Sequence, residues 1–155
     1  MDGNFIKAGA GLVPSDELTR EWFAKLKPGS GVAAECRQPR NKWMHDKWFA
    51  LVHLAFDYWS ETATPVEYKG QQVSPDFERF RKDVTVLAGK FHYVTNLRGE
   101  VRAEADSISF GSMSQETFDE LYGQTLSVLM TRVFTGPQWS EARVQEVVGQ
   151  VASFA

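Results

Sequence analysis

Residues 41–60 read NKWMHDKWFALVHLAFDYWS, and they give the strongest indication of the fold. Its apolar side chains recur at helical spacing and form one stripe: Met44, Trp48, Leu51, Ala55 and Trp59. The second half of the stretch is apolar nearly all round, which is typical of a helix buried at the centre of a core. The pattern therefore predicts a long central helix that begins near Pro39 or Asn41 and ends at about Ser60.

Shorter elements are expected on the C-terminal side of this helix. Val66 to Val73 predicts a hairpin that turns at Lys69-Gly70, because glycine allows the tight turn between two short β-prone runs. A helix capped by Ser74 is expected next, with Pro75 at its first position and Gly89 at its end. Two strands, over Lys90–Asn96 and Glu100–Phe110, should follow around the turn Leu97-Arg98-Gly99. The chain is then expected to form a helix capped by Ser114 over Gln115–Phe134 and a last helix from Ser140 to about Phe154.

The N-terminal side predicts three further elements. They are a strand over Phe5–Lys7, a helix capped by Ser15 and running to about Leu26, and a strand over Val32–Arg37. The chain has 155 residues, which is enough to close one hydrophobic core. We therefore expect an α+β protein, a single domain over residues 1–155, whose central aromatic-rich helix is joined by two long further helices packed on small antiparallel strand pairs.

The composition predicts an ordinary globular protein of the cytoplasm. Hydrophobic residues make up 43% of the chain and charged residues 24%, so disorder is not expected. The start of the chain lacks the basic and apolar regions of a signal peptide, and no run approaches the length of a membrane span. Cys36 is the one cysteine and cannot form an internal disulfide. With three scattered histidines beside it, neither a structural zinc site nor any other cofactor is expected.

Charge is distributed unevenly along a chain whose net charge is -3. Residues 37–102 hold eleven Lys and Arg against eight Asp and Glu, whereas residues 103–155 hold two against seven. A basic middle and an acidic end permit a local anion-binding face on an acidic protein.

The sequence does not predict an enzyme. Cys36 falls at an inward-facing position of its expected strand, where a free cysteine usually behaves as a small hydrophobic side chain. The turn Gly9-Ala10-Gly11 has neither the length of a phosphate-binding loop nor its Lys-Ser/Thr pair. No nucleophile with a base, and no acid–base pair, can be assembled from the spacing. We expect no catalytic residue and no metal ligand.

One cluster favours nucleic-acid binding. Its basic members at the start of the central helix are Arg37, Arg40, Lys42 and Lys47, and they lie around Trp43. Helix N-termini and arginine favour phosphate, and an exposed aromatic ring offers a base something to stack on. The residues that could extend this cluster are Arg79, Arg81, Lys82 and Lys90. The alternative is a charged helix start with Trp43 in the core, and a solvated helix surface with intrahelical ion pairs at residues 76–83.

The order and spacing of several runs resemble an uncharacterised family of phage and prophage proteins, known only as a domain of unknown function. The resemblance extends from about Phe5 to Phe134. The runs that carry it are Arg40 to Leu51, Ala55-Phe56-Asp57-Tyr58-Trp59, Phe80 to Thr85 with Ala88-Gly89, and Ser107-Ile108-Ser109-Phe110 with Met113 and Phe118.

More remotely, Arg40 to Leu51 is similar to the helix start of the NinB (Orf) recombination proteins of lambda-like phages. Arg40 matches an arginine of that motif, and Phe49-Ala50 match its Trp-Ala. Met44 and His45 replace a Gln-Asn pair, so no role of that pair is carried over. Members of that family are dimers that bind single-stranded DNA and work with the host single-strand-binding protein to help load recombinase. The resemblance implies a similar role, a similar partner and a homodimer.

Two hypotheses of function result. The first is a non-enzymatic mediator of phage recombination or replication that binds DNA, with single strands preferred. Its contacts are expected at Arg37, Arg40, Lys42, Trp43 and Lys47, supported by Arg79, Arg81 and Lys82. The second is a protein-binding module that inhibits or redirects a host protein such as a defence or replication factor, because the acidic C-terminal third could dock on a basic partner.

Overall fold

The long helix predicted from residues 41–60 is present as α2, Lys42–Thr62, in the computed structural model, which describes residues 3–35, 41–109 and 111–154. The chain divides into two compact units, residues 1–36 and residues 37–155. The described residues form five helices and three antiparallel strand pairs, which confirms the predicted α+β class. That residues 1–155 form one domain stays a prediction.

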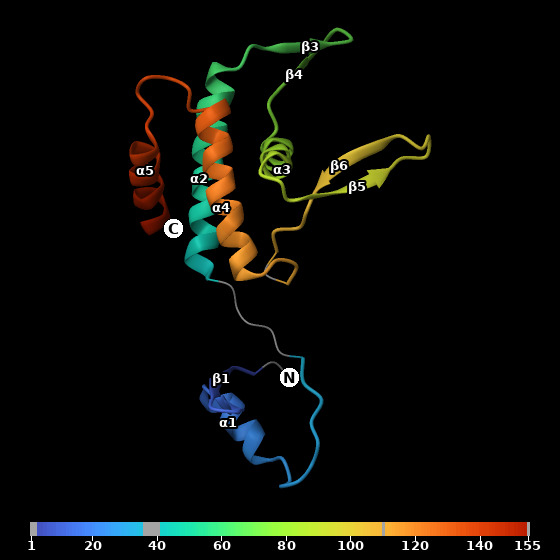
Figure 1. Cartoon of the computed structure of the whole chain (residues 1–155), viewed down its shortest axis with the longest axis vertical. Coiled ribbons are helices and arrows are strands. Elements are labelled where there is room, and N and C mark those ends of the chain that lie inside the picture. Colours follow the sequence, from blue (N-terminus) through green and yellow to red (C-terminus); the bar gives the residue numbers. More distant parts are fainter. Residues whose placement is uncertain (1–2, 36–40, 110, 155) are drawn as a thin grey trace. The chain divides into compact units, whose positions relative to one another are not determined.

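The second unit is built around α2 (Figure 1). Three helices pack with it: α3, Phe77–Leu87; α4, Gln115–Arg132; and α5, Glu141–Ser153. The predicted central helix and two long further helices are thus confirmed. The helices pack chiefly against one another, and α3 also packs against a strand pair.

Aromatic and aliphatic side chains from all four helices fill the core of this unit. Trp48 is fully buried, and its indole N–H donates a hydrogen bond of 3.0 Å to the hydroxyl of Thr125, which is also fully buried. A buried donor without a partner is costly, so this bond fixes α2 against α4. The other fully buried large apolar side chains among the described residues of the unit are Phe118, Phe134, Leu51, Leu121, Leu129, Val52, Val144 and Val148.

Two hairpins extend from the helices of this unit (Figure 1). The first joins β3, Val66–Tyr68, to β4, Gln71–Val73, and it turns at Lys69-Gly70 as predicted. Both turn residues have positive φ, 50° and 74°, which matches the right-handed twist of the strands. The second hairpin joins β5, Phe91–Thr95, to β6, Val101–Ala105. The second strand was expected to reach Phe110, but it ends at Ala105 because the chain turns inward and buries Ile108 and Met113.

The predicted helix caps are partly confirmed. Ser114 and Ser140 cap α4 and α5, each accepting a hydrogen bond from a backbone N–H of the first turn. The expected cap Ser74 is wrong, because Asp76 caps α3 by accepting from Arg79 N at 2.7 Å. Pro75 therefore precedes the helix instead of starting it.

The first unit consists of β1, Phe5–Ala8, β2, Gly11–Pro14, and α1, Glu17–Ala24. The two strands pair antiparallel, and β2 was absent from the sequence-based prediction. The expected cap Ser15 is also wrong. Asp16 caps α1, since its carboxylate accepts from both the backbone N–H and the hydroxyl of Thr19 at 2.8 Å.

The strand expected over Val32–Arg37 is contradicted where the structure describes it. Residues 31–35 form neither helix nor strand. Cys36 and Arg37 lie outside the described residues, as do Pro39, Arg40 and Phe110. Of the helices in the described ranges, none combines the length and the apolar character needed to cross a membrane.

Candidate nucleic-acid interface

The start of α2 is anchored to the start of α4. Asn41 caps α2 by accepting a hydrogen bond from Trp43 N at 3.0 Å, and its own N–H donates to Gln115 Oε1 at 2.6 Å. Gln115 is the first residue of α4. The two helices therefore begin side by side, at the same end of the unit (Figure 1). Their combined dipoles make this end favourable for anions.

Lys47 lies between two aromatic rings. Its ammonium nitrogen is 5.0 Å from the ring centroid of Trp43 and 5.0 Å from that of Tyr122. Trp43 is 52% exposed, so it is not the core residue of the alternative reading. Within the described ranges Lys47 forms no ion pair. The cation is thus held by ring faces and remains available to an anion.

Tyr122 forms the buried side of this arrangement. Its hydroxyl donates a hydrogen bond of 2.7 Å to Gln145 Oε1 on α5, and burial raises its pKa to about 12. The phenol is therefore neutral near pH 7 and acts as a fixed apolar support for Lys47.

Lys42 is the first residue of α2, and it forms an ion pair of 2.5 Å with Asp46. The lysine side chain of this pair is 80% exposed. Exposed pairs of this kind contribute at most about 1 kcal/mol. A phosphate could therefore replace Asp46 as the partner of Lys42 at little cost.

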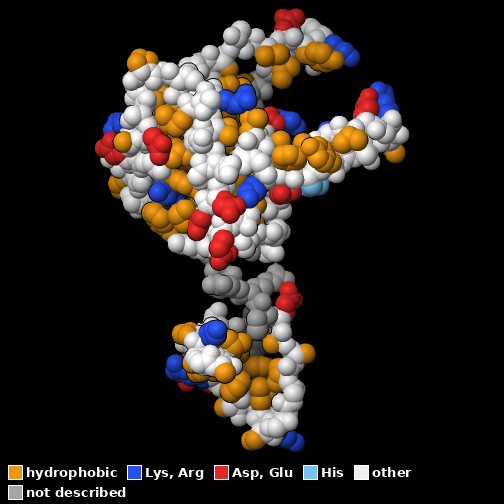
Figure 2. Space-filling view, viewed as in Figure 1, with side chains coloured by type: hydrophobic (Ala, Val, Ile, Leu, Met, Phe, Trp, Pro, Cys, Tyr) orange, Lys and Arg blue, Asp and Glu red, His pale blue; other side chains and the backbone are white. Residues whose placement is uncertain are grey.

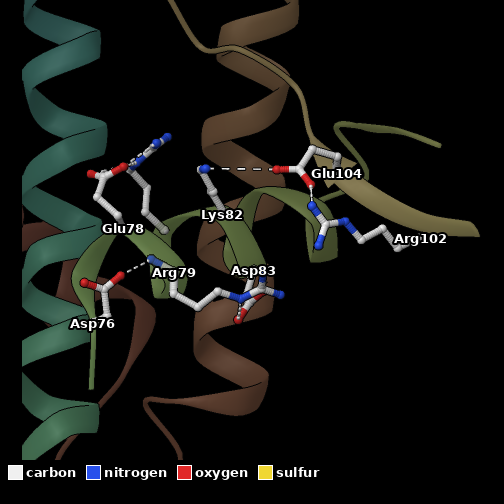
Figure 3. Close-up of polar contacts among 8 residues, drawn as sticks. Asp76, Glu78, Arg79, Lys82, Asp83, Arg102 and Glu104 are labelled. Atoms are coloured by element: carbon white, nitrogen blue, oxygen red, sulfur yellow. Dashed lines mark hydrogen bonds and ion pairs between the residues drawn. The ribbon is translucent and has the colours of Figure 1, made fainter. Parts of the chain in front are cut away.

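The basic residues of α3 are all engaged in ion pairs (Figure 3). Arg79 pairs with Asp83 at 2.6 Å and Arg81 with Glu78 at 2.7 Å, both within the helix. The hydrogen bond from Arg81 and the nearby positive charges lower the pKa of Glu78. The intrahelical pairs of the alternative reading are thus confirmed for Arg79 and Arg81.

Lys82 reaches from α3 to Glu104 on β6 at 4.0 Å, and Arg102 approaches the same carboxylate at 3.1 Å (Figure 3). Lys90 pairs with Glu120 on α4 at 3.0 Å. The structure therefore brings Lys47 and Trp43 together, pairs Lys42 of the same helix with Asp46, and holds Arg79, Arg81 and Lys82 in ion pairs of their own. That Arg79, Arg81 and Lys82 bind nucleic acid stays a prediction.

Two residues of the expected cluster are not among those that the structure describes. Arg37 and Arg40 lie outside the described residues. Conversely, Tyr122 and Gln115 belong to the site but were not predicted. Both lie on α4, far along the chain from α2, and neither has a local sequence signal beyond its place in a helix. In the residues that the structure covers, no three His, Cys, Asp or Glu side chains form a group that could hold a metal ion.

These features define a class: a small α+β protein with a helical core, two hairpins and a lysine held by aromatic rings at its central helix start. Over residues 2–75 and 66–154 the sequence matches the family described as "Protein of unknown function (DUF1367)". The chain belongs to this family, and the expected membership of an uncharacterised family is confirmed.

A solved structure described as "Structural Genomics, NinB" is similar to this chain. The two share 19% sequence identity, and the match covers 81% of this chain and 88% of that one, with a TM-score of 0.35. None of the curated proteins matches the chain.

Proposed function

We propose that this protein is a non-enzymatic phage or prophage accessory protein that binds single-stranded DNA during recombination or replication in the host cytoplasm. The observation that carries the proposal is the half-exposed ring of Trp43 with Lys47 above it, a cation that forms no ion pair with another described residue. Stacking on such a ring is sequence-tolerant, because every base has an aromatic face. A cation beside the ring can reach the phosphate of the stacked nucleotide.

The contact is expected to form at the start of α2. A base stacks on Trp43, Lys47 binds its phosphate, and Lys42 exchanges Asp46 for a neighbouring phosphate. Arg37 and Arg40 precede this turn in the chain and are proposed to extend the contact along the strand. The net charge of -3 means that binding depends on this local face and not on the protein as a whole.

The test is fluorescence anisotropy of a labelled single-stranded oligonucleotide, titrated at low and physiological salt beside a matching duplex. Trp43→Ala is expected to weaken single-strand binding by about 5- to 100-fold, the usual range for loss of one stacked base. Lys47→Gln should weaken binding and reduce the slope of log affinity against log salt by about 0.7, the contribution of one phosphate contact.

Lys25→Gln is the matched control, because it removes the same charge from an exposed position that belongs to the first unit and not to the proposed site. It should leave affinity within about twofold, since no phosphate contact is lost. Binding that is insensitive to salt, or equal loss in Lys25→Gln and Lys47→Gln, would contradict the proposed site.

The homodimer and the partnership with host single-strand-binding protein belong to the same proposal. Light scattering across a concentration series measures the first, with twice the mass of 17.5 kDa expected. Co-sedimentation of the two proteins on a single-stranded oligonucleotide measures the second. A monomer at all concentrations, or exclusion of one protein by the other, would contradict these two parts.

A second candidate function is a protein-binding module that blocks or redirects a host factor. The exposed apolar side chains of the first hairpin, among them Val66 and Val73, favour it because such surfaces often mark protein contacts. Absence of any DNA binding, together with a stoichiometric complex with a purified host replication or defence protein, would support this candidate over the first.

A further inference from the structure

The two hairpins of the second unit carry open apolar faces. In the first, the alternation of side chains places Val66, Tyr68 and Val73 on one face of the β3–β4 pair. All three are at least half exposed, and Tyr68 is 64% exposed. An isolated two-stranded hairpin is only marginally stable in water, so contact of this face with another molecule would stabilise it.

The second hairpin has one face against the helices and one face open. Glu104 of β6 pairs with Lys82 of α3, which fixes the inner face. The opposite face carries Tyr93, which is 72% exposed, together with Val101 on the neighbouring strand. The rings of Tyr93 and Phe91 form a T-shaped pair with centroids 5.5 Å apart, and Tyr93 stays largely exposed to solvent.

Each hairpin also ends in a basic side chain. Lys69 lies in the β3–β4 turn with its ammonium nitrogen 5.3 Å from the ring centroid of Tyr68. Arg98 lies in the β5–β6 turn, where its backbone N–H donates to Asn96 Oδ1. In contrast to the cations of α3, neither side chain takes part in an ion pair with another described residue.

The hairpin faces that bear Tyr68 and Tyr93 carry no carboxylate. Glu67 precedes Tyr68 in β3 and therefore points to the other face of the hairpin. Glu100, beside the second turn, accepts a hydrogen bond from Asn96 Nδ2. Figure 2 shows hydrophobic side chains along both projections, charged side chains at their ends and an open space between them.

We propose that these two hairpins form a second binding surface for single-stranded DNA. Tyr68 and Tyr93 stack on bases, and Lys69 and Arg98 bind the phosphates beside them. The inference rests on the proposed function and extends it to four residues outside the cluster at α2. A protein partner is disfavoured, because an apolar protein surface would cover Lys69 and Arg98 without offering either cation an anionic group.

The experiment uses the full-length protein and poly-dT oligonucleotides of increasing length in the anisotropy assay. A Tyr68→Ala, Tyr93→Ala double variant is expected to bind at least about 25-fold more weakly, since two stacking contacts, each worth at least about fivefold, are lost. A Lys69→Gln, Arg98→Gln double variant should lower the salt slope by about 1.4, the contribution of two phosphates. Both effects should grow with oligonucleotide length, because longer strands reach more of the surface.

Arg143→Gln is the matched control, since it removes an exposed cation that is already paired with Glu146 and belongs to neither proposed surface. It should change affinity by less than about twofold. The circular dichroism spectrum and melting midpoint of every variant should match those of the parent, because the substituted side chains are exposed.

The outcomes separate this inference from the proposed function. Unchanged binding by both hairpin variants, with loss in Trp43→Ala, overturns the hairpin surface and leaves the α2 site. Loss in the hairpin variants with unchanged binding by Trp43→Ala supports the hairpins and overturns the α2 site. No binding by the parent protein overturns both. Unchanged DNA binding with lost binding of a purified host protein overturns the inference in favour of a protein occupant.

Discussion

The two units of the chain combine similar elements, helices with antiparallel strands, but they bury very different side chains. All of the buried hydrophobic residues in the described ranges lie in the second unit, from Trp48 to Ala152. In residues 3–35 the single buried side chain is Thr19, which is a hydrogen-bonding residue. Larger apolar side chains there, such as Ile6 and Leu18, are exposed.

Different interactions therefore stabilise the two units. The second unit is stabilised by burial of apolar surface, the dominant favourable term in folding. The first unit is held by local polar contacts around Thr19, whose hydroxyl accepts from Asn4 N and donates to Asp16. Segments of fewer than about 40 residues rarely build a sufficient core. We therefore expect the second unit to unfold cooperatively and the first to open locally at much lower free energy.

The largest expected effect is on the core of the second unit. Trp48→Ala should lower the free energy of unfolding by about 3–5 kcal/mol, because it leaves a cavity among fully buried side chains. Chemical denaturation followed by circular dichroism measures this loss. Trp43→Ala, at a half-exposed site on the same helix, is the control and should cost far less. Equal losses at the two positions would contradict the proposed division between core and surface.

A smaller effect is expected from the buried hydrogen bond between α2 and α4. Thr125→Val keeps the volume but removes the acceptor of the Trp48 indole N–H, and should cost about 1–3 kcal/mol of unfolding free energy. Thr131→Val is the matched control on the same helix, since its hydroxyl is exposed and bonds only to the carbonyl of Ser127. A Thr125→Val protein as stable as the parent would show that this bond does not support the packing.

Removal of helix caps compares the two units directly. Ser114→Ala should lower the global stability by about 1 kcal/mol, because α4 belongs to the cooperative core. Asp16→Ala removes the cap of α1 and should speed amide hydrogen exchange in residues 3–35 without moving the global unfolding midpoint. If Asp16→Ala shifts the global midpoint as much as Ser114→Ala, the first unit is part of the same cooperative structure.

The smallest expected effect is a dependence on pH confined to the first unit. Hydrogen bonds from the backbone and side chain of Thr19 lower the pKa of Asp16 below its usual 3.8. A carboxylate with a depressed pKa stabilises the folded state above the unfolded value, and this contribution is lost as the pH falls through the folded pKa. NMR should therefore show the Thr19 amide shifting and losing protection below pH 3.8. A Thr19 amide unchanged down to pH 2 would contradict the role of this cap.

Local signals account for most of the elements that were predicted correctly. Ser114 and Ser140 each stand directly before a helical apolar pattern, and both are caps in the structure. Lys69-Gly70 supplies the positive φ angles that a two-residue turn requires. These features depend on neighbours within a few residues, so the sequence alone reveals them.

Errors arose where two local signals competed. Ser15 and Ser74 are each followed closely by an aspartate, and serine and aspartate have similar preferences for the cap position. The backbone of Ser15 is bound to Asn4 O, which leaves Asp16 to begin α1. The alternation over Val32–Glu35 resembles a strand, but no partner strand pairs with it among the described residues.

Local patterns in the sequence were sufficient to predict the central helix, the caps of α4 and α5, the turn of the first hairpin and the presence of Trp43 beside basic residues. Which of the described cations form ion pairs depends on tertiary packing, because pairs such as Lys82–Glu104 join separate elements. Tertiary packing also decided that Lys47 lies against Tyr122 and that Trp48 bonds to Thr125. Helix packing brings these partners together across long stretches of chain, and no local pattern encodes that geometry.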